Sequence, residues 1–341
     1  MKPRILIIYT GGTIGMIEDA DTKVLKPFDF THLMENVPKV KMLDYEIDNI
    51  QFHPPIDSSD MSIGHWQQIA SAIADNYLGY DGFVVLHGTD TMAYTASALS
   101  FMLDNLHKPV IITGSQLPIG EVRTDGEENL ITALQIAAAR DSHGEPMVQE
   151  VAILFEDYLW RGNRATKRSA DNFNAFKSYN YPYLAKIGLG INFDADALLR
   201  SPKRPLTLRL EMDAAVMSID LFPGITPEAI AYHLAAPGIK GAVIRTYGAG
   251  NAPTSPAIIG AIRDAVKRGI VIVNVTQCVH GCVNSNRYET GDLLCAAGVV
   301  SGHDITFEAA MTKMMFLFGL GFGPVAVKKY LQTSLRGEIT I

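Results

Sequence analysis

Cysteine is scarce in this chain, with three residues, Cys278, Cys282 and Cys295, among 341. A small and odd number fits a reducing compartment better than a disulfide framework, so we expect a cytoplasmic protein. Two of these cysteines flank His280 in a run that superficially resembles a metal site. A zinc site needs four well-spaced donors, however, and here the fourth would have to come from far along the chain. We therefore expect no metal.

The sequence also lacks long hydrophobic runs and concentrated positive charge. The first apolar stretch ends after about five residues at Thr10, too short for the core of a signal peptide. The stretch 311–320 falls well short of the roughly 20 residues that a membrane span needs. The net charge is −7 and Lys and Arg form no large cluster, so the sequence indicates no basic surface that would bind nucleic acid or an anionic membrane. We expect a small-molecule partner instead.

Apolar strand-like runs and amphipathic helices alternate in the first half of the chain. The runs 5–9, 83–86, 110–113 and 151–155 are almost continuously apolar, which suits parallel strands covered on both faces. Between them, apolar residues recur every three to four positions over 66–77 and 92–106, which predicts helices. Asp60 and Ser62 are the candidate N-caps of the first of these helices.

The second half repeats this alternation in smaller units after a stretch that loses helical periodicity. The segment 193–210 contains Ser-Pro and Arg-Pro pairs and suits a crossover. Strands are expected at 215–219, 241–245 and 270–275, and helices at 227–234 and 256–267. A chain of this length suits two domains. We predict an α/β fold with a larger catalytic domain with a parallel-rich sheet at 1–190, a linker at 191–212 and a smaller α/β domain at 213–341.

Two of the predicted strands end in similar turns that carry hydroxyl groups. The first opens into 10–15 (TGGTIG) and the other into 87–91 (HGTDT). Ligands bind at the carboxyl ends of strands in open α/β sheets, so these turns favour a threonine nucleophile beside backbone N–H groups. A tight turn with a capping threonine is the alternative for the first motif. Neither a G-x-G-x-x-G spacing nor a Walker-type motif supports a nucleotide site.

A threonine nucleophile needs a base that takes its proton. Thr89 supplies a second hydroxyl beside Asp90, although Asp90 can also cap the helix that follows. His87 directly follows its strand, and we do not expect it to be the base. The basic-polar run 161–167 supplies a positive charge to pair with Asp90, and its Lys167 can act through a hydroxyl if its pKa is lowered. A solvated basic loop is the alternative reading of this run.

Two further loops carry polar side chains at the ends of predicted elements. The segment 57–60 (DSSD) precedes a helix, where hydroxyls and N–H groups can hold a carboxylate or form an N-terminal cap. The segment 245–251 (RTYGAGN) ends a strand of the second domain. It can reach across an interface or simply form a satisfied loop.

Taken together, these motifs resemble the bacterial asparaginase family, and most closely its cytoplasmic type I branch. The similarity runs nearly end to end. Its most specific stretches are 10–15, 57–60, 86–103, 113–116, 161–167, 245–253, 276–278 and 335–338.

The resemblance implies hydrolysis of L-asparagine to L-aspartate and ammonia through a β-acyl-threonine intermediate, with no metal or organic cofactor. L-glutamine would be a minor substrate. Each expected role then has a matching position. Thr13 matches the nucleophile; Thr89, Asp90 and Lys167 match the proton relay that activates water; Asp57, Ser58 and Ser59 match the groups that hold the substrate's α-amino and α-carboxylate groups, and Ser115 is placed with them.

The resemblance also implies assembly into a homodimer or a homotetramer built as a dimer of dimers. Asn251 matches an asparagine that the neighbouring subunit contributes to the site. Some type I enzymes are activated by a second asparagine bound between subunits. Thr166, Arg245 and Cys278 match that effector site, and Thr276 and Gln277 lie beside the last of these.

Two departures from the family pattern affect these expectations. Secreted type II members have an acidic residue shortly after their Thr-Gln pair, where this chain has 279–281 (VHG). Many members carry a tyrosine in the lid after the first motif, and 16–25 contains none. Amino-group recognition and lid closure are therefore expected to differ in detail.

Two rival functions share parts of this pattern. The amidotransferase subunit that releases ammonia from glutamine carries an extension before its Thr-Gly-Gly-Thr turn, and here nine residues precede Thr10. A non-catalytic amino-acid sensor would not need to keep Thr13, Thr89, Asp90 and Lys167 together. The intact set favours an enzyme.

Overall fold

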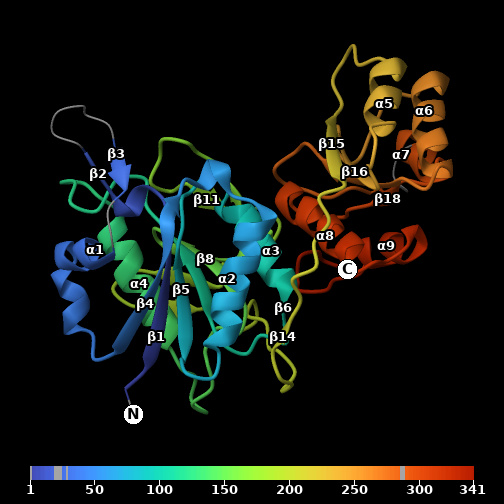
Figure 1. The fold of residues 1–341 in the computed structure, drawn as a ribbon. Coiled ribbons are helices and arrows are strands. Elements are labelled where there is room, and N and C mark those ends of the chain that lie inside the picture. Colours follow the sequence, from blue (N-terminus) through green and yellow to red (C-terminus); the bar gives the residue numbers. More distant parts are fainter. Residues whose placement is uncertain (1, 19–24, 28–29, 285–288) are drawn as a thin grey trace. The chain divides into compact units, whose positions relative to one another are not determined.

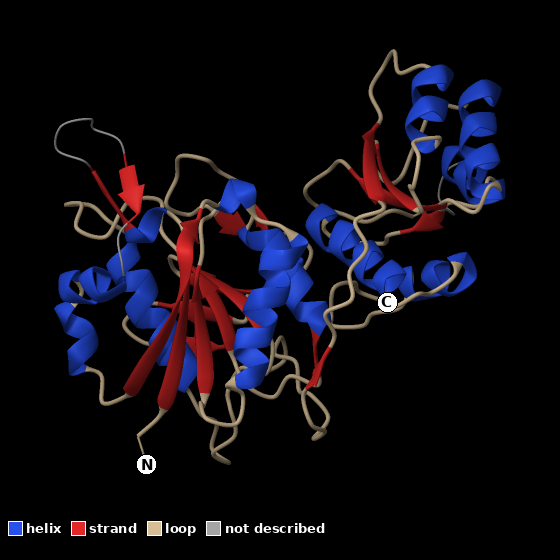
Figure 2. Ribbon diagram, in the orientation of Figure 1, coloured by secondary structure: helices blue, strands red, loops and turns tan. Residues whose placement is uncertain are grey.

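The computed structural model describes residues 2–18, 25–27, 30–284 and 289–341. By its internal contacts, the chain divides into two compact units, Met1–Leu210 and Glu211–Ile341. Each unit has its own sheet flanked by helices (Figure 1, Figure 2). The α/β fold class predicted from the alternating pattern is therefore confirmed. Within the described residues, no helix combines the length and apolar character that a membrane crossing requires.

The first unit is built on an eight-stranded sheet that is parallel in one half. In sheet order its strands are β13 (Ile191–Phe193), β12 (Ala185–Ile187), β9 (Tyr158–Arg161), β8 (Val151–Phe155), β7 (Val110–Thr113), β5 (Gly82–Leu86), β1 (Arg4–Gly11) and β4 (Glu46–Ile56). Neighbours from β4 to β8 are parallel, and those from β8 to β13 are antiparallel. The four strands predicted in this half of the chain are confirmed as β1, β5, β7 and β8.

Helices cover both faces of this sheet. They are α1 (Phe30–Asn36), α2 (Ile63–Asp75), α3 (Met92–Met102) and α4 (Gly126–Ala138). Figure 1 shows α1 and α4 on one side of the strands and α2 and α3 on the other. Ile5, Ile7 and Tyr9 of β1 are fully buried in one core cluster with residues of α4. The strands are thus apolar on both faces because both faces are covered.

Sequence patterns located the starts of these helices better than their ends. Ser62, one of the two expected caps, accepts a hydrogen bond from the His65 N–H and begins α2. The prediction that α3 continues to residue 106 is wrong. Leu103 leaves the helix because its backbone pairs with Leu208 in a short antiparallel ladder, between β6 (Leu103–Asp104) and β14 (Thr207–Leu208). Periodicity within 92–106 gives no sign of that distant partner.

Short elements complete the first unit. They are β2 (Met16–Glu18), β3 (Leu25–Pro27), β10 (Thr166–Lys167), β11 (Phe176–Lys177) and the 3-10 turns Thr13–Gly15, Pro38–Met42, Ser58–Asp60 and Gly162–Arg164. Within the expected lid, 16–25, residues 19–24 lie outside the described part of the chain.

The second unit is a four-stranded parallel sheet between two layers of helices. Its strands, in sheet order, are β15 (Val216–Asp220), β16 (Gly241–Thr246), β17 (Val271–Thr276) and β18 (Val300–Ser301). Its helices are α5 (Pro227–Leu234), α6 (Pro256–Lys267), α7 (Glu289–Ala296), α8 (Phe307–Gly319) and α9 (Pro324–Leu331). The helices α5, α6 and α7 lie on one face, and α8 and α9 on the other (Figure 1). The predicted helices at 227–234 and 256–267 are confirmed to the residue.

Candidate active site

Four turns meet at the carboxyl edge of the parallel strands in the first unit. They follow β4, β1, β5 and β7, which are neighbours in the sheet. Glycines allow their backbones to touch: a Cβ on Gly12 would lie 2.4 Å from the Gly88 nitrogen, and one on Gly114 would lie 2.2 Å from the His87 oxygen. A Cβ on Gly88 would lie 2.5 Å from the Ser58 hydroxyl. The structure thus brings together the turns that the sequence singled out.

The two threonines of the turn after β1 have different environments. Thr10 is buried, and its hydroxyl donates to the Leu86 carbonyl at 2.9 Å, so it ties β1 to β5. Thr13 begins the 3-10 turn that follows and is only half-buried. Tyr9 lies beneath this turn and donates its hydroxyl to the Gly15 carbonyl at 3.0 Å. The Thr10 hydroxyl therefore stabilises the sheet, whereas Thr13 lies partly exposed at the carboxyl edge of the strands.

Lys167 links the turn after β5, which contains Thr89 and Asp90, to a distant part of the chain. Its ammonium donates to the Thr89 hydroxyl at 2.8 Å and to an Asp90 carboxylate oxygen at 2.7 Å. The sequence predicts that the run 161–167 supplies a positive charge to Asp90, and this is confirmed, with Lys167 as the partner. Since an ammonium has no lone pair, Thr89 accepts from Lys167 and directs its own proton to the Gln116 side-chain oxygen, 3.3 Å away. These contacts form a hydrogen-bonded chain of ionisable and hydroxyl groups.

Asp90 does not cap the helix that follows it. The N-cap of α3 is Thr91, and its hydroxyl donates to the Ser58 carbonyl at 2.7 Å. The Asp90 side chain is 65% exposed, whereas Lys167 is 18% exposed. The carboxylate therefore remains open to solvent and to a ligand while it is paired with the lysine.

The segment after β4 presents a carboxylate that is held ionised. Asp57 accepts hydrogen bonds from the Ser59 N–H at 2.9 Å and from the Ser59 hydroxyl at 2.8 Å, and these bonds lower its pKa. Ser58 of the same segment is buried against Gly88 in the turn after β5. The negative charge of Asp57 suits an ammonium group of a ligand.

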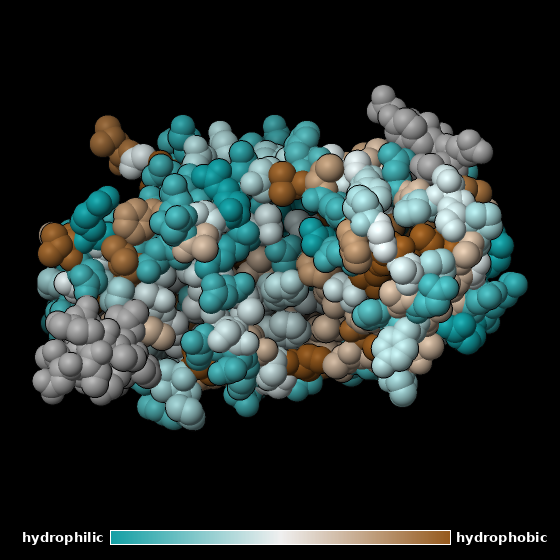
Figure 3. All heavy atoms as spheres, turned by 90° about the horizontal axis from the view of Figure 1, so that it is seen from above, coloured by the Kyte–Doolittle hydropathy of each residue, from teal (hydrophilic) through white to brown (hydrophobic). Residues whose placement is uncertain are grey.

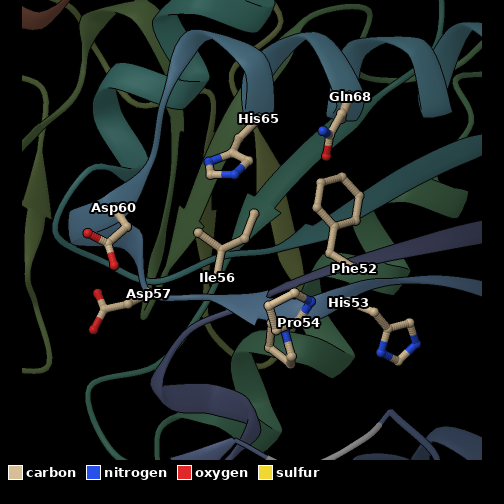
Figure 4. Close-up of a pocket in the computed structure, with 9 residues that line it drawn as sticks. Phe52, His53, Pro54, Ile56, Asp57, Asp60, His65 and Gln68 are labelled. Atoms are coloured by element: carbon tan, nitrogen blue, oxygen red, sulfur yellow. The ribbon is translucent and has the colours of Figure 1, made fainter.

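A pocket of about 440 Å³ lies beside Asp57. Phe52 and Ile56 of β4 point toward Gln68 and His65 of α2, and Asp57 is at one end of this space (Figure 4). Seen from above, the surface of the first unit is largely hydrophilic, with hydrophobic residues scattered among the hydrophilic ones (Figure 3, left). A small polar ligand fits these surroundings better than an extended apolar one.

The turn after β7 depends on two residues to which the sequence reading gave no role, Gln116 and Asp125. The buried Asp125 carboxylate accepts from the Gln116 N–H at 3.0 Å and from the Leu117 N–H at 3.2 Å. Burial raises the pKa of Asp125, and these bonds oppose the rise. Ser115 is 1% exposed, and its hydroxyl donates to the Leu117 carbonyl at 2.5 Å. Gln116 was visible in the motif at 113–116, but its link to Thr89 was not.

The remaining predicted residues, apart from Thr166 in β10, lie in the second unit at the ends of β16 and β17. Arg245 pairs with Asp220, with 3.1 Å between the guanidinium and a carboxylate oxygen. The Thr276 hydroxyl donates to the Gly248 carbonyl at 2.6 Å and accepts from the Cys278 N–H at 3.0 Å. The structure therefore gathers Arg245, Thr276, Gln277 and Cys278 on one sheet edge, where the Gln277 amide donates to the Leu221 and Arg245 carbonyls.

Asn251 belongs to a tight loop at this same edge of the second unit. Its backbone N–H donates to the Tyr247 carbonyl at 2.8 Å, and its carbonyl accepts from the Tyr247 N–H at 2.9 Å. In the described part of the chain, His, Cys, Asp and Glu side chains form no group of three that could hold a metal ion.

Two family models match this chain. The model described as asparaginase, N-terminal, matches residues 4–199, and the glutaminase/asparaginase C-terminal domain matches residues 215–331. The chain belongs to the asparaginase family. The family resemblance inferred from the motifs is thereby confirmed.

Individual proteins are similar to this chain over its whole length. The chain is 42% identical to L-asparaginase 1 of Escherichia coli (strain K12), over 99% of this chain and 98% of that one. It is 40% identical to the 60 kDa lysophospholipase of Mus musculus, over 99% of this chain and 63% of that longer protein. Among solved structures, L-asparaginase I from Vibrio cholerae is 38% identical with a TM-score of 0.90, and the match covers 100% of both chains.

Proposed function

We propose that this protein hydrolyses L-asparagine to L-aspartate and ammonia, with Thr13 as the nucleophile. The observation that carries this proposal is the pairing of Lys167 with both Thr89 and Asp90, in a turn whose glycine contacts the glycine before Thr13. A hydroxyl nucleophile, a proton relay and backbone N–H groups then share one sheet edge. The full-length similarity to L-asparaginase 1 supports the choice of substrate.

The reaction proceeds in two steps through an ester on Thr13. In the first step, the Thr13 oxygen attacks the side-chain amide carbon of asparagine, and its proton passes through the relay to the departing nitrogen, which leaves as ammonia. In the second step, a water molecule attacks the ester carbon and loses a proton to the relay. The C–O bond to Thr13 then breaks, the Thr13 hydroxyl regains a proton, and aspartate is released. Backbone N–H groups of the glycine-rich turns stabilise the oxyanion in both steps.

Substrate recognition follows from charge and shape at the same edge. Asp57 is held ionised by Ser59 and binds the α-ammonium group of the amino acid. Ser58, Ser59 and Ser115 complete the substrate-binding set. The Ser59 hydroxyl is held by Asp57 and the Ser115 hydroxyl by the Leu117 carbonyl, so we assign these two serines to shaping the edge around the α-amino and α-carboxylate groups. We assign L-glutamine as a minor substrate; the site has to distinguish it from L-asparagine by one methylene, a difference worth about 1 to 3 kcal/mol.

Assembly completes the site and regulates it. The proposed enzyme is a cytoplasmic homodimer or a homotetramer arranged as a dimer of dimers, in which Asn251 reaches the site of a neighbouring subunit. Thr166, Arg245, Thr276, Gln277 and Cys278 form the effector site for a second asparagine. The grouping of the last four on one sheet edge supports this assignment.

Steady-state ammonia release across a wide L-asparagine range, with L-glutamine in parallel, tests the proposed reaction. We expect ammonia from asparagine in the wild type, and a loss of several orders of magnitude in kcat for Thr13→Ala and Thr89→Val with folding intact. No ammonia from asparagine would favour the sensor, and ammonia from glutamine alone would favour the amidotransferase subunit. Near-wild-type turnover in either variant would remove that residue from its role.

A further inference from the structure

A chain of hydrogen bonds runs from helix α2 through α3 to the turn after β5, and the proposed mechanism does not use it. The indole N–H of Trp66 donates to the Thr95 hydroxyl at 3.0 Å. That hydroxyl lies 2.8 Å from Nε2 of His87, and Nδ1 of the same ring lies 2.6 Å from the Gly88 carbonyl oxygen. Thr95 and His87 are fully buried.

The partners decide which way each bond points. A carbonyl oxygen only accepts, so Nδ1 of His87 carries a proton and donates to Gly88. The indole N–H only donates, so Thr95 receives that bond on its oxygen and is free to donate its own proton to Nε2 of His87. This arrangement requires a neutral ring. Burial lowers the pKa of His87 to about 4, which keeps the ring neutral at ordinary pH.

The Gly88 carbonyl fixes the orientation of the peptide that leads into Thr89. A planar trans peptide holds its C=O and N–H on opposite sides. When His87 holds the Gly88 oxygen toward the core, the Thr89 N–H points away from the imidazole ring. The same peptide precedes the hydroxyl that accepts a hydrogen bond from Lys167.

Position 88 needs such a restraint because it is glycine. A side chain there would collide with Ser58, and the neighbouring Gly12 already contacts the Gly88 backbone. Glycine is the residue that fits, but it is also the residue with the least restricted backbone. A hydrogen bond from a buried ring to its carbonyl removes that freedom without adding a side chain to the crowded turn.

We propose that His87 is a positioning residue: it pins the Gly88 carbonyl and thereby aims the Thr89 N–H and hydroxyl toward the reacting groups, while Thr95 and Trp66 hold the ring. This inference rests on the proposed function for its kinetic consequences. The orientation of the ring is independent of that function. His87 acts neither as a base nor as a ligand for the substrate, because the ring is buried and both nitrogens are occupied.

Substitutions at position 87 separate the two hydrogen bonds. In His87→Asn the side-chain amide can take the place of Nδ1 and still donate to Gly88, so we expect kcat within about fivefold of wild type. His87→Gln retains a partner for Thr95 but not for Gly88, and His87→Leu retains neither. For both we expect kcat to fall by about 10²-fold, comparable to the loss of one preorganised donor, with KM changed much less.

Helix α3 offers a matched control for the second bond. Thr95→Val removes the hydroxyl that holds the ring, and we expect kcat to fall several-fold. Ser97 is equally buried on the same helix, but its hydroxyl donates to the Ala93 carbonyl and not toward the turn. Ser97→Ala should therefore leave kcat unchanged.

Nitrogen-15 NMR of histidine-labelled wild-type protein tests the orientation without relying on activity. The His87 signal, assigned by its loss in His87→Asn, should show a neutral ring protonated at Nδ1 at neutral pH. A ring protonated at Nε2 overturns the proposal whatever the kinetics. Equal losses of kcat in the Asn and Leu variants, or an unchanged kcat in folded His87→Leu, also overturn it. A wild type that releases no ammonia refutes the proposed function instead, while the NMR result still decides the ring orientation.

Discussion

Each unit of the protein contains a close lysine–carboxylate pair, and the two pairs differ in their surroundings. Lys167 and Asp90 are 18% and 65% exposed. Lys313 and Glu338 are both 0% exposed, and the Lys313 ammonium also donates to the Thr333 carbonyl at 2.7 Å. Exposed ion pairs contribute about 0 to 1 kcal/mol to stability, so the first pair gives the fold little. This agrees with the role in the proton relay that we propose for it.

The buried pair has a different use. Burial lowers the pKa of Lys313 and would raise that of Glu338, but the ammonium and the N–H groups of Leu335 and Arg336 lower the pKa of Glu338. Glu338 thus gathers the end of the chain around Lys313 of α8. Two pairs of similar composition therefore differ in their surroundings and in the roles we assign them: the open one keeps the proposed proton relay accessible, and the closed one anchors a terminal segment.

Removing the lysine of the open pair should have the largest effect on activity. Lys167→Met takes away the donor to Thr89 and Asp90, and we expect kcat to fall by about 10³-fold or more. The free energy of unfolding should change by less than about 1 kcal/mol. Steady-state ammonia release and urea unfolding measure the two quantities. A variant that loses stability in proportion to activity would contradict the assignment of this pair to catalysis and not to the fold.

Removing the lysine of the closed pair should reverse this pattern. Lys313→Met leaves the Glu338 carboxylate buried without its cation, which costs about 3 to 5 kcal/mol of stability. The kcat of the protein that remains folded should stay close to wild type. Urea unfolding of Lys313→Met beside the double variant Lys313→Met/Glu338→Leu provides the check. We expect the double variant to recover much of the loss, and no recovery would argue against an uncompensated charge as the cause.

His87 is buried without an ionic partner among the described residues, and this should make the stability of the fold depend on pH. His87 has a pKa of about 4 when folded and an ordinary value of 6.5 when unfolded. Between these values the unfolded chain binds a proton that the folded chain does not, so stability falls as pH decreases from 6.5 to 4, by about 3 kcal/mol in all. Carboxylates titrate in the same range. The measurement is therefore the difference in urea stability between wild type and His87→Asn at pH 7 and pH 4.5.

We expect the wild type to lose more stability than His87→Asn over this interval. Equal losses would mean that the ring is protonated inside the folded protein. That result would also contradict the neutral ring on which the positioning of Gly88 depends.

Local patterns in the sequence predicted the parts of this fold that depend on local physics. The apolar run that forms β1 and the Ser62 cap of α2 both follow from short-range rules, and both are confirmed. A pairing of Asp90 with the basic run 161–167 was also foreseen, because basic residues are concentrated there, and Lys167 makes it although 77 residues separate the two. The end of α3 was not, since it depends on pairing between Leu103 and Leu208.

The residues that support the site were harder to foresee than those proposed to react. The Gln116 side-chain oxygen accepts a hydrogen bond from the Thr89 hydroxyl, and the Asp125 carboxylate accepts one from the Gln116 N–H. Neither Gln116 nor Asp125 stands out in the sequence by its type or spacing. His87 was considered only as a base. Its contacts with Thr95 and Gly88 arise from the packing of α3 against the sheet, and a motif cannot state which buried nitrogen meets which oxygen.

The smallest expected effect concerns Arg245, whose half-exposed pair with Asp220 in the second unit resembles the open pair more than the closed one. If the wild type shows a sigmoidal asparagine curve, Arg245→Ala should make it hyperbolic with little change in maximal rate, because the guanidinium is assigned to the effector and not to the reacting groups. The control is Asp220→Asn, which leaves Arg245 in place and should keep the curve sigmoidal. Sigmoidal kinetics that persist in Arg245→Ala would remove Arg245 from the effector site, and its pairing with Asp220 would then be a surface contact alone.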